Sequence, residues 1–132
     1  MALPGSAANL DHLAIGPGGV FAIDSKQYRG RLQLDALGKL WHGRYPLAPA
    51  VRTVSWEADQ AAQVLPDPGM VVVPIVAVHG AQFPWGKVVT DGVPVLPARH
   101  LPSMLRQLPV VLGPERVAWL ADQARVRFHA AG

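Results

Sequence analysis

The sequence predicts a mixed α/β fold, and three observations support this. A hairpin-like stretch of apolar residues folds about the turn Gly16-Pro17-Gly18-Gly19, and a near-continuous apolar run follows at residues 70–79. Apolar residues at helical spacing occupy residues 50–65 and recur near the C-terminus. The chain has 132 residues, half of them apolar, which is enough for one core. We therefore expect a single domain over residues 1–132.

Short strands account for most of the first half. The run at residues 70–79 predicts a central strand buried on both faces, and residues 45–49 predict a proline-rich loop. Asp91-Gly92 is a typical hairpin turn. The expected strands are residues 9–15, 20–26, 31–34, 40–42, 70–79, 87–90 and 93–96.

Helices are expected at three places: residues 50–65, 101–108 and 114–128. The first ends at Pro66-Asp67-Pro68-Gly69, and Pro114 suits the first turn of the last. Because strands and helices do not alternate regularly, a mixed sheet is favoured over a regular βαβ fold.

Composition narrows the possible functions. The chain has no cysteine, which excludes disulfides and thiolate metal sites. The longest apolar run is too short to cross a bilayer, and the N-terminal residues do not read as a signal peptide, so we expect a cytoplasmic protein. The net charge of +3 permits a phosphate-rich partner without requiring one.

The first hairpin carries charges among apolar residues. Its turn is centred between Pro17 and Gly18, so residues whose numbers sum to 35 are paired. Asp11 and Asp24 then lie opposite each other, with Cβ atoms roughly 4.5–5.5 Å apart. Lys26 points to the same face, about 7 Å along the strand. Both faces of the hairpin are otherwise apolar, which is typical of interior strands in a covered sheet.

Two facing carboxylates repel, so something must compensate. One aspartate can hold a proton, Lys26 can neutralise part of the charge, or a divalent cation can bind. Mg²⁺ suits two carboxylates, to which the main-chain carbonyl of Ser25 can add an oxygen. Lys26 would then orient or deprotonate a water attacking a phosphodiester. In the simpler alternative the strand ends reach solvent, and Asp24 and Lys26 form an ordinary surface pair.

The stretch NLDHLAIGPGGVFAIDSKQYRG, residues 9–30, resembles the nuclease-related domain (NERD), which is similar to the PD-(D/E)xK nucleases. Asp24-Ser25-Lys26 matches the acid-x-lysine motif, and Tyr28-Arg29-Gly30 matches the residues that follow it. The later segments VVVPIVAVHG, DGVPVLPARHLPSMLRQLP and VLGPERVAWLADQARVRF look like the actinobacterial branch. The resemblance implies a restriction-endonuclease-like mixed sheet flanked by helices. It also implies Asp11 and Asp24 as metal ligands and Lys26 as the catalytic lysine.

One departure concerns the start of the chain. The family usually has a helix before the first strand, often with a glutamate that completes the acidic site, and here only a short segment without acidic residues precedes Asp11. We therefore expect apolar residues such as Leu13, Ile15 or Phe21 to be exposed. A partner chain or second copy would cover that face.

Other candidate residues lie outside the hairpin. Tyr28, Arg29 and Arg31 are candidates for contacting a DNA backbone, with Lys39 and Arg44 nearby. The helix expected from residue 50 carries Glu57, Gln60 and Gln63. Either glutamine can approach the metal, although a solvated face is favoured.

Taken with the resemblance, these residues predict hydrolysis of DNA phosphodiesters with Mg²⁺ or Mn²⁺, in DNA processing or repair. The alternative is a non-catalytic DNA-binding or protein-interaction module with an incomplete nuclease site.

Overall fold

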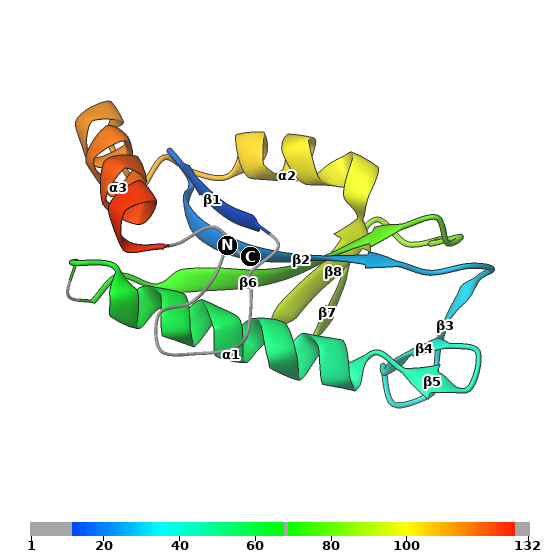
Figure 1. The fold of residues 1–132 in the computed structure, drawn as a ribbon. Coiled ribbons are helices and arrows are strands. Elements are labelled where there is room, and N and C mark those ends of the chain that lie inside the picture. Colours follow the sequence, from blue (N-terminus) through cyan, green and yellow to red (C-terminus); the bar gives the residue numbers. More distant parts are fainter. Residues whose placement is uncertain (1–11, 68, 129–132) are drawn as a thin grey trace.

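The computed structural model describes residues 12–67 and 69–128. A five-stranded mixed sheet forms its centre, in the order β1-β2-β6-β8-β7 (Figure 1). This is the mixed α/β architecture predicted from the sequence, and it is consistent with a restriction-endonuclease-like fold. The strands are β1 (His12–Gly16), β2 (Gly19–Gln27), β6 (Val72–His79), β7 (Val88–Thr90) and β8 (Val93–Pro97).

The β1–β2 hairpin has the predicted register. His12 lies opposite Ile23 and Gly16 lies opposite Gly19, so the paired numbers sum to 35. The expectation that both strands are interior is wrong for β1, which forms one edge of the described sheet. The second hairpin is also as predicted: Asp91 and Gly92 have φ of 49° and 77°, as a type I′ turn requires.

Strand β6 is the central strand. It pairs in parallel with β2 on one side and with β8 on the other. The crossover from β2 to β6 includes α1 (Ala48–Val64), which begins two residues earlier than expected because Pro49 suits its first turn. The carboxyl ends of β2, β6 and β8 therefore meet at one edge of the sheet.

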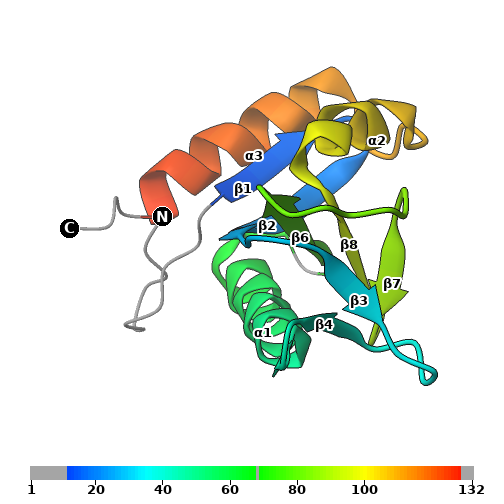
Figure 2. The same cartoon turned by 90° about the vertical axis from the view of Figure 1, so that its right-hand side faces the viewer.

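Helices cover both faces of the sheet (Figures 1 and 2). Helix α1 packs on the face to which Val20 and Ala22 of β2 contribute. Helix α2 (Leu101–Gln107), entered through the 3-10 turn η1 (Ala98–His100), packs on the face of Phe21 and Ile23. Helix α3 (Pro114–Arg127) lies beside β1.

These helices correct the expectation of an uncovered face. Phe21 is buried, and Leu13 and Ile15 are half-buried. Leu120 and Ala124 of α3 belong to the cluster against which both β1 residues pack. A partner chain is therefore not needed to cover these three side chains.

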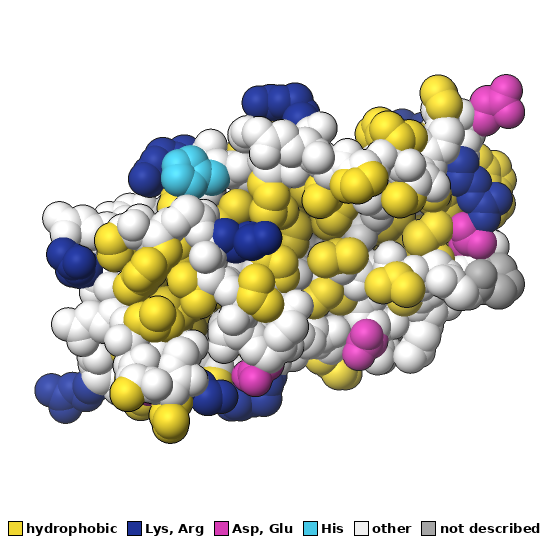
Figure 3. Space-filling view, turned by 180° about the vertical axis from the view of Figure 1, so that it is seen from behind, with side chains coloured by type: hydrophobic (Ala, Val, Ile, Leu, Met, Phe, Trp, Pro, Cys, Tyr) yellow, Lys and Arg dark blue, Asp and Glu magenta, His cyan; other side chains and the backbone are white. Residues whose placement is uncertain are grey.

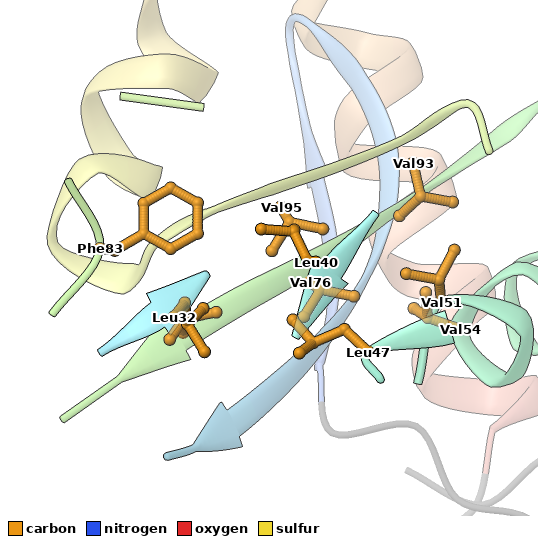
Figure 4. Packing of buried hydrophobic residues seen from close by; sticks show 10 residues of the cluster. Leu32, Leu40, Leu47, Val51, Val54, Val76, Phe83, Val93 and Val95 are labelled. Carbon is orange, nitrogen blue, oxygen red and sulfur yellow. The ribbon is translucent and has the colours of Figure 1, made fainter. Parts of the chain in front are cut away.

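A small second sheet follows β2, with strands β3 (Leu32–Leu34), β4 (Leu40–His42) and β5 (Tyr45–Pro46). The prediction of a loop over residues 45–49 is wrong, because β5 pairs with β4 and α1 already begins at Ala48. Figure 4 shows how this sheet joins the core: its Leu32 and Leu40 belong to one buried cluster with Val51 and Val54 of α1, Val76 of β6 and Val95 of β8.

None of the helices in the described part of the chain is both long enough and apolar enough to cross a membrane.

Gly80 directly follows β6 and lies beside Gln27 and Tyr28, where β2 ends. Its φ is 78°, and a Cβ there would lie 2.9 Å from the Tyr28 carbonyl oxygen and would collide with the Gln27 side chain. We expect Gly80→Ala to lower the free energy of unfolding by about 1–3 kcal/mol. Urea denaturation tests this. Gly86→Ala is the control, because nothing lies within 4 Å of its added Cβ; equal losses in the two variants would contradict the prediction.

Candidate functional site

The candidate site is built around Asp24 in β2. Side chains alternate along a strand, so Asp24 shares the face of Val20 and Ala22, which is the face that α1 covers. Asp24 is only 7% exposed and is paired in register with the buried Val76 of β6. Its carboxylate therefore lies in the layer between the sheet and α1.

Lys26 lies on the same face, two residues further along β2. Its Nζ is 3.3 Å from Asp24 Oδ2, and its side chain is 39% exposed. A solvent-accessible ammonium thus reaches a buried carboxylate. The alternative of an ordinary surface pair is wrong for Asp24, because its side chain is buried even though the strand end reaches solvent at Lys26 and Gln27.

The roles predicted for two other site residues, Asp11 and Ser25, stay predictions. Asp11 lies outside the described residues, so its predicted position opposite Asp24 stays a prediction. Ser25 is half-buried and points to the face opposite that of Asp24. Only its main-chain carbonyl was expected to serve as a ligand, and this also stays a prediction.

Tyr28 follows the lysine and is half-buried. Its backbone N–H donates to the His79 carbonyl oxygen at 3.0 Å, and its ring lies 4.8 Å from the ring of His42. Burial raises the pKa of Tyr28 above 10.0, while Lys26 lowers it and Asp24 raises it. The phenol is therefore within electrostatic range of both charged residues of the site.

The two arginines predicted to contact DNA are exposed. The Arg29 carbonyl oxygen accepts a hydrogen bond from His42 Nε2 at 2.5 Å, and Arg31 forms an isolated bridge with Gln82 after β6. Both side chains thus extend from a segment held beside the carboxyl ends of β2 and β6. Figure 3 shows the face seen from behind, where basic side chains are dispersed among apolar ones.

Sequence reasoning missed Glu57. It was expected on a solvated face of α1, yet it is 6% exposed, whereas Gln60 is half-buried and Gln63 is exposed. Asp24 and Glu57 are the buried charged side chains among the described residues. A signal was present: Glu57 lies between Val54 and Ala58 at the margin of the apolar stripe.

Comparison with known protein families shows to which family the chain belongs. The nuclease-related domain (NERD) family matches residues 2–79, more than half of the chain. The chain belongs to the NERD family. The match includes β1, β2, α1 and β6 of the domain. No curated protein and no solved structure matches the chain significantly.

The chemistry of the site suits a hard cation. Carboxylate and carbonyl oxygens are the donors that Mg²⁺ and Mn²⁺ prefer, and the NERD domain presents a buried carboxylate at Asp24. Among the described residues, no three histidine, aspartate or glutamate side chains gather closely enough to hold a metal. Asp11, the predicted second ligand, lies outside the described residues, so its place in this site stays a prediction.

The raised pKa of Tyr28 predicts a pH dependence. The fold favours the neutral phenol, so its contribution to stability is complete below pH 10.0 and is lost as the pH rises through the raised pKa. We expect Asp24→Asn to lower the pKa of Tyr28 and Lys26→Met to raise it.

Phenolate absorbance during an alkaline titration measures this pKa, and Tyr28→Phe assigns the signal, since the chain has one other tyrosine. A pKa unmoved by either substitution would show that neither charge acts on the Tyr28 ring.

Proposed function

We propose that this NERD domain hydrolyses DNA phosphodiesters with Mg²⁺ or Mn²⁺. The observation that supports this most is the buried Asp24 carboxylate with the Lys26 ammonium 3.3 Å away on the exposed side. An acid and a lysine so placed suit a reaction in which charge develops on a phosphate and a nearby water. Membership in a family of nuclease-related domains supports the same reaction class.

In this proposal Asp24 and Asp11 hold the cation, with the main-chain carbonyl of Ser25 as a further ligand. The structural premise is that the register of residues 12–16 with 19–23 extends by one pair. When bound, the cation supplies Lewis acidity and offsets charge that develops on the phosphate. The buried position of Asp24 strengthens its attraction for a cation, because little water screens it.

Lys26 acts on the water and the phosphate. Its side chain is partly in solvent, so Nζ can meet an incoming water while staying near Asp24. As an ammonium it orients this water, and in its neutral amine form it could instead remove a proton from it, as the water oxygen bonds to phosphorus and a phosphorus–oxygen ester bond breaks. The leaving oxygen takes up a proton from solvent, and the products are a phosphomonoester and an alcohol.

Arg29 and Arg31 are proposed to contact the DNA backbone, with Tyr28 between them and Lys26. Such contacts position a strand without reading its sequence. They place the phosphates at the edge where β2 and β6 end, which is where ligands bind in open α/β sheets. A role in DNA processing or repair follows from this activity.

The decisive test is cleavage of single- and double-stranded DNA with and without Mg²⁺. We expect Lys26→Ala and Asp24→Asn to reduce cleavage by about 100-fold or more, because each removes a group that acts at the reacting atoms. Lys87→Ala is the control, as it removes an exposed lysine beside β7. Equal cleavage by the wild type and Lys26→Ala would refute the proposed role of Lys26.

A second candidate function is a non-catalytic DNA-binding or protein-interaction module. It is favoured by the absence of a three-residue metal cluster within residues 12–67 and 69–128. Wild-type protein that binds DNA but does not cleave it with Mg²⁺ or Mn²⁺ would support this alternative.

The DNA contacts can be measured separately from cleavage, in the presence of EDTA. We expect Arg29→Ala and Arg31→Ala each to reduce by about 1 the slope of log affinity against log salt. Arg127→Ala is the control, since this exposed arginine is on α3, away from β3 in Figure 1. Equal slopes in all variants would exclude phosphate contacts by Arg29 and Arg31.

A further inference from the structure

Glu57 is a charged residue in the buried stripe of α1. The other buried residues of this helix are apolar: Val51, Val54, Ala58 and Ala61. Burying a carboxylate is costly even when it is paired. A buried carboxylate beside a candidate site is therefore a candidate for a functional role in that site.

The position of Glu57 along α1 matches that of Asp24 along β2. Leu65, directly after α1, packs in one cluster with Val20 and Val72, and Val51 near the other end packs in another with Val78. The helix thus runs antiparallel to β2 and β6. Eight residues of helix from Leu65 to Glu57 span about 12 Å, and the four from Val20 to Asp24 span about 13 Å. Glu57 and Asp24 therefore lie at about the same level along β2.

Glu57 also lies on the flank of α1 that is turned towards β2. Val51, on the other flank, packs with Val93 and Val95 of β8. Val64, two turns after Glu57 and on its flank, packs into the cluster that also takes in Leu13 of β1. A right-handed β2–α1–β6 crossover requires this arrangement.

We propose that Glu57 is a further carboxylate ligand of the divalent cation held at Asp24. The inference rests on the proposed function, since it concerns the same cation. Two carboxylates close together in a buried layer would repel each other, and a shared divalent cation would turn this repulsion into attraction. Helix α1 would thereby complete the acidic shell from the side opposite the sheet.

Magnesium binding to the wild-type protein tests this without DNA or cleavage. The chain has two glutamates, so labelling glutamate side chains with ¹³C gives two carboxylate signals, from Glu57 and from Glu115. Glu115 is exposed in the first turn of α3 and is an internal control. We expect added Mg²⁺ to shift the Glu57 signal saturably while the Glu115 signal stays in place.

Substitution provides the second measurement. We expect Glu57→Gln to weaken Mg²⁺ or Mn²⁺ binding by about tenfold or more in isothermal titration calorimetry. Asp59→Asn is the matched control, since it neutralises an exposed acid on the same helix. It should leave the affinity unchanged.

The outcomes separate this inference from the proposed function. If the wild type binds the metal but the Glu57 signal does not move, or Glu57→Gln binds equally well, Glu57 is not a ligand and the proposed nuclease site is unaffected. If the wild type binds neither Mg²⁺ nor Mn²⁺, both proposals fall. The carboxylate signals are read on the wild type, so the test holds even if Glu57→Gln does not fold.

Discussion

The parallel pairing of β2 with β6 is the constraint on which the rest of this domain depends. Parallel neighbours require a long crossover, and here the crossover carries the small second sheet and then α1. Because α1 must cover both strands, the face of β2 that bears Asp24 becomes an interior layer. An acid-x-lysine motif that would be unremarkable on a surface hairpin is thereby placed under a helix.

Burial determines the electrostatic character of this layer. Asp24 and Glu57 are almost completely shielded from water, whereas the Lys26 side chain still reaches it. Charges interact more strongly where water is excluded, so a cation entering here would gain more than at a surface carboxylate. Lys26 is accessible to solvent, whereas the carboxylates beneath α1 are not. This arrangement would suit a phosphate that approaches Lys26 from solvent and a metal ion bound at the buried carboxylates. Burial raises the pKa of Tyr28, and the nearby charges of Lys26 and Asp24 act on it in opposite directions, so this residue after β2 is coupled to both.

Much of the fold was predictable because local patterns determine it. The turn between Pro17 and Gly18 determined the hairpin register, and Asp91-Gly92 marked the second hairpin. Predictions were wrong where a pairing or packing partner decides, whether that partner is near in the sequence or far. The strand β5 forms only because β4 is available to pair with it. Phe21 is buried because α2 reaches it from about eighty residues further along the chain.

The sequence by itself determined that Asp24 and Lys26 lie on the same face of β2, because alternation along a strand is a local property of the backbone. It also determined the order of the elements apart from β5 and η1, and the membership in a nuclease-related family. Only the tertiary structure decided that Asp24 is buried and that Glu57 shares its layer. Helical spacing tells which residues lie on one side of a helix, but a glutamate at the margin of an apolar stripe faces solvent or protein according to what packs beside it. Here the crossover of α1 between β2 and β6 turns that margin towards the sheet.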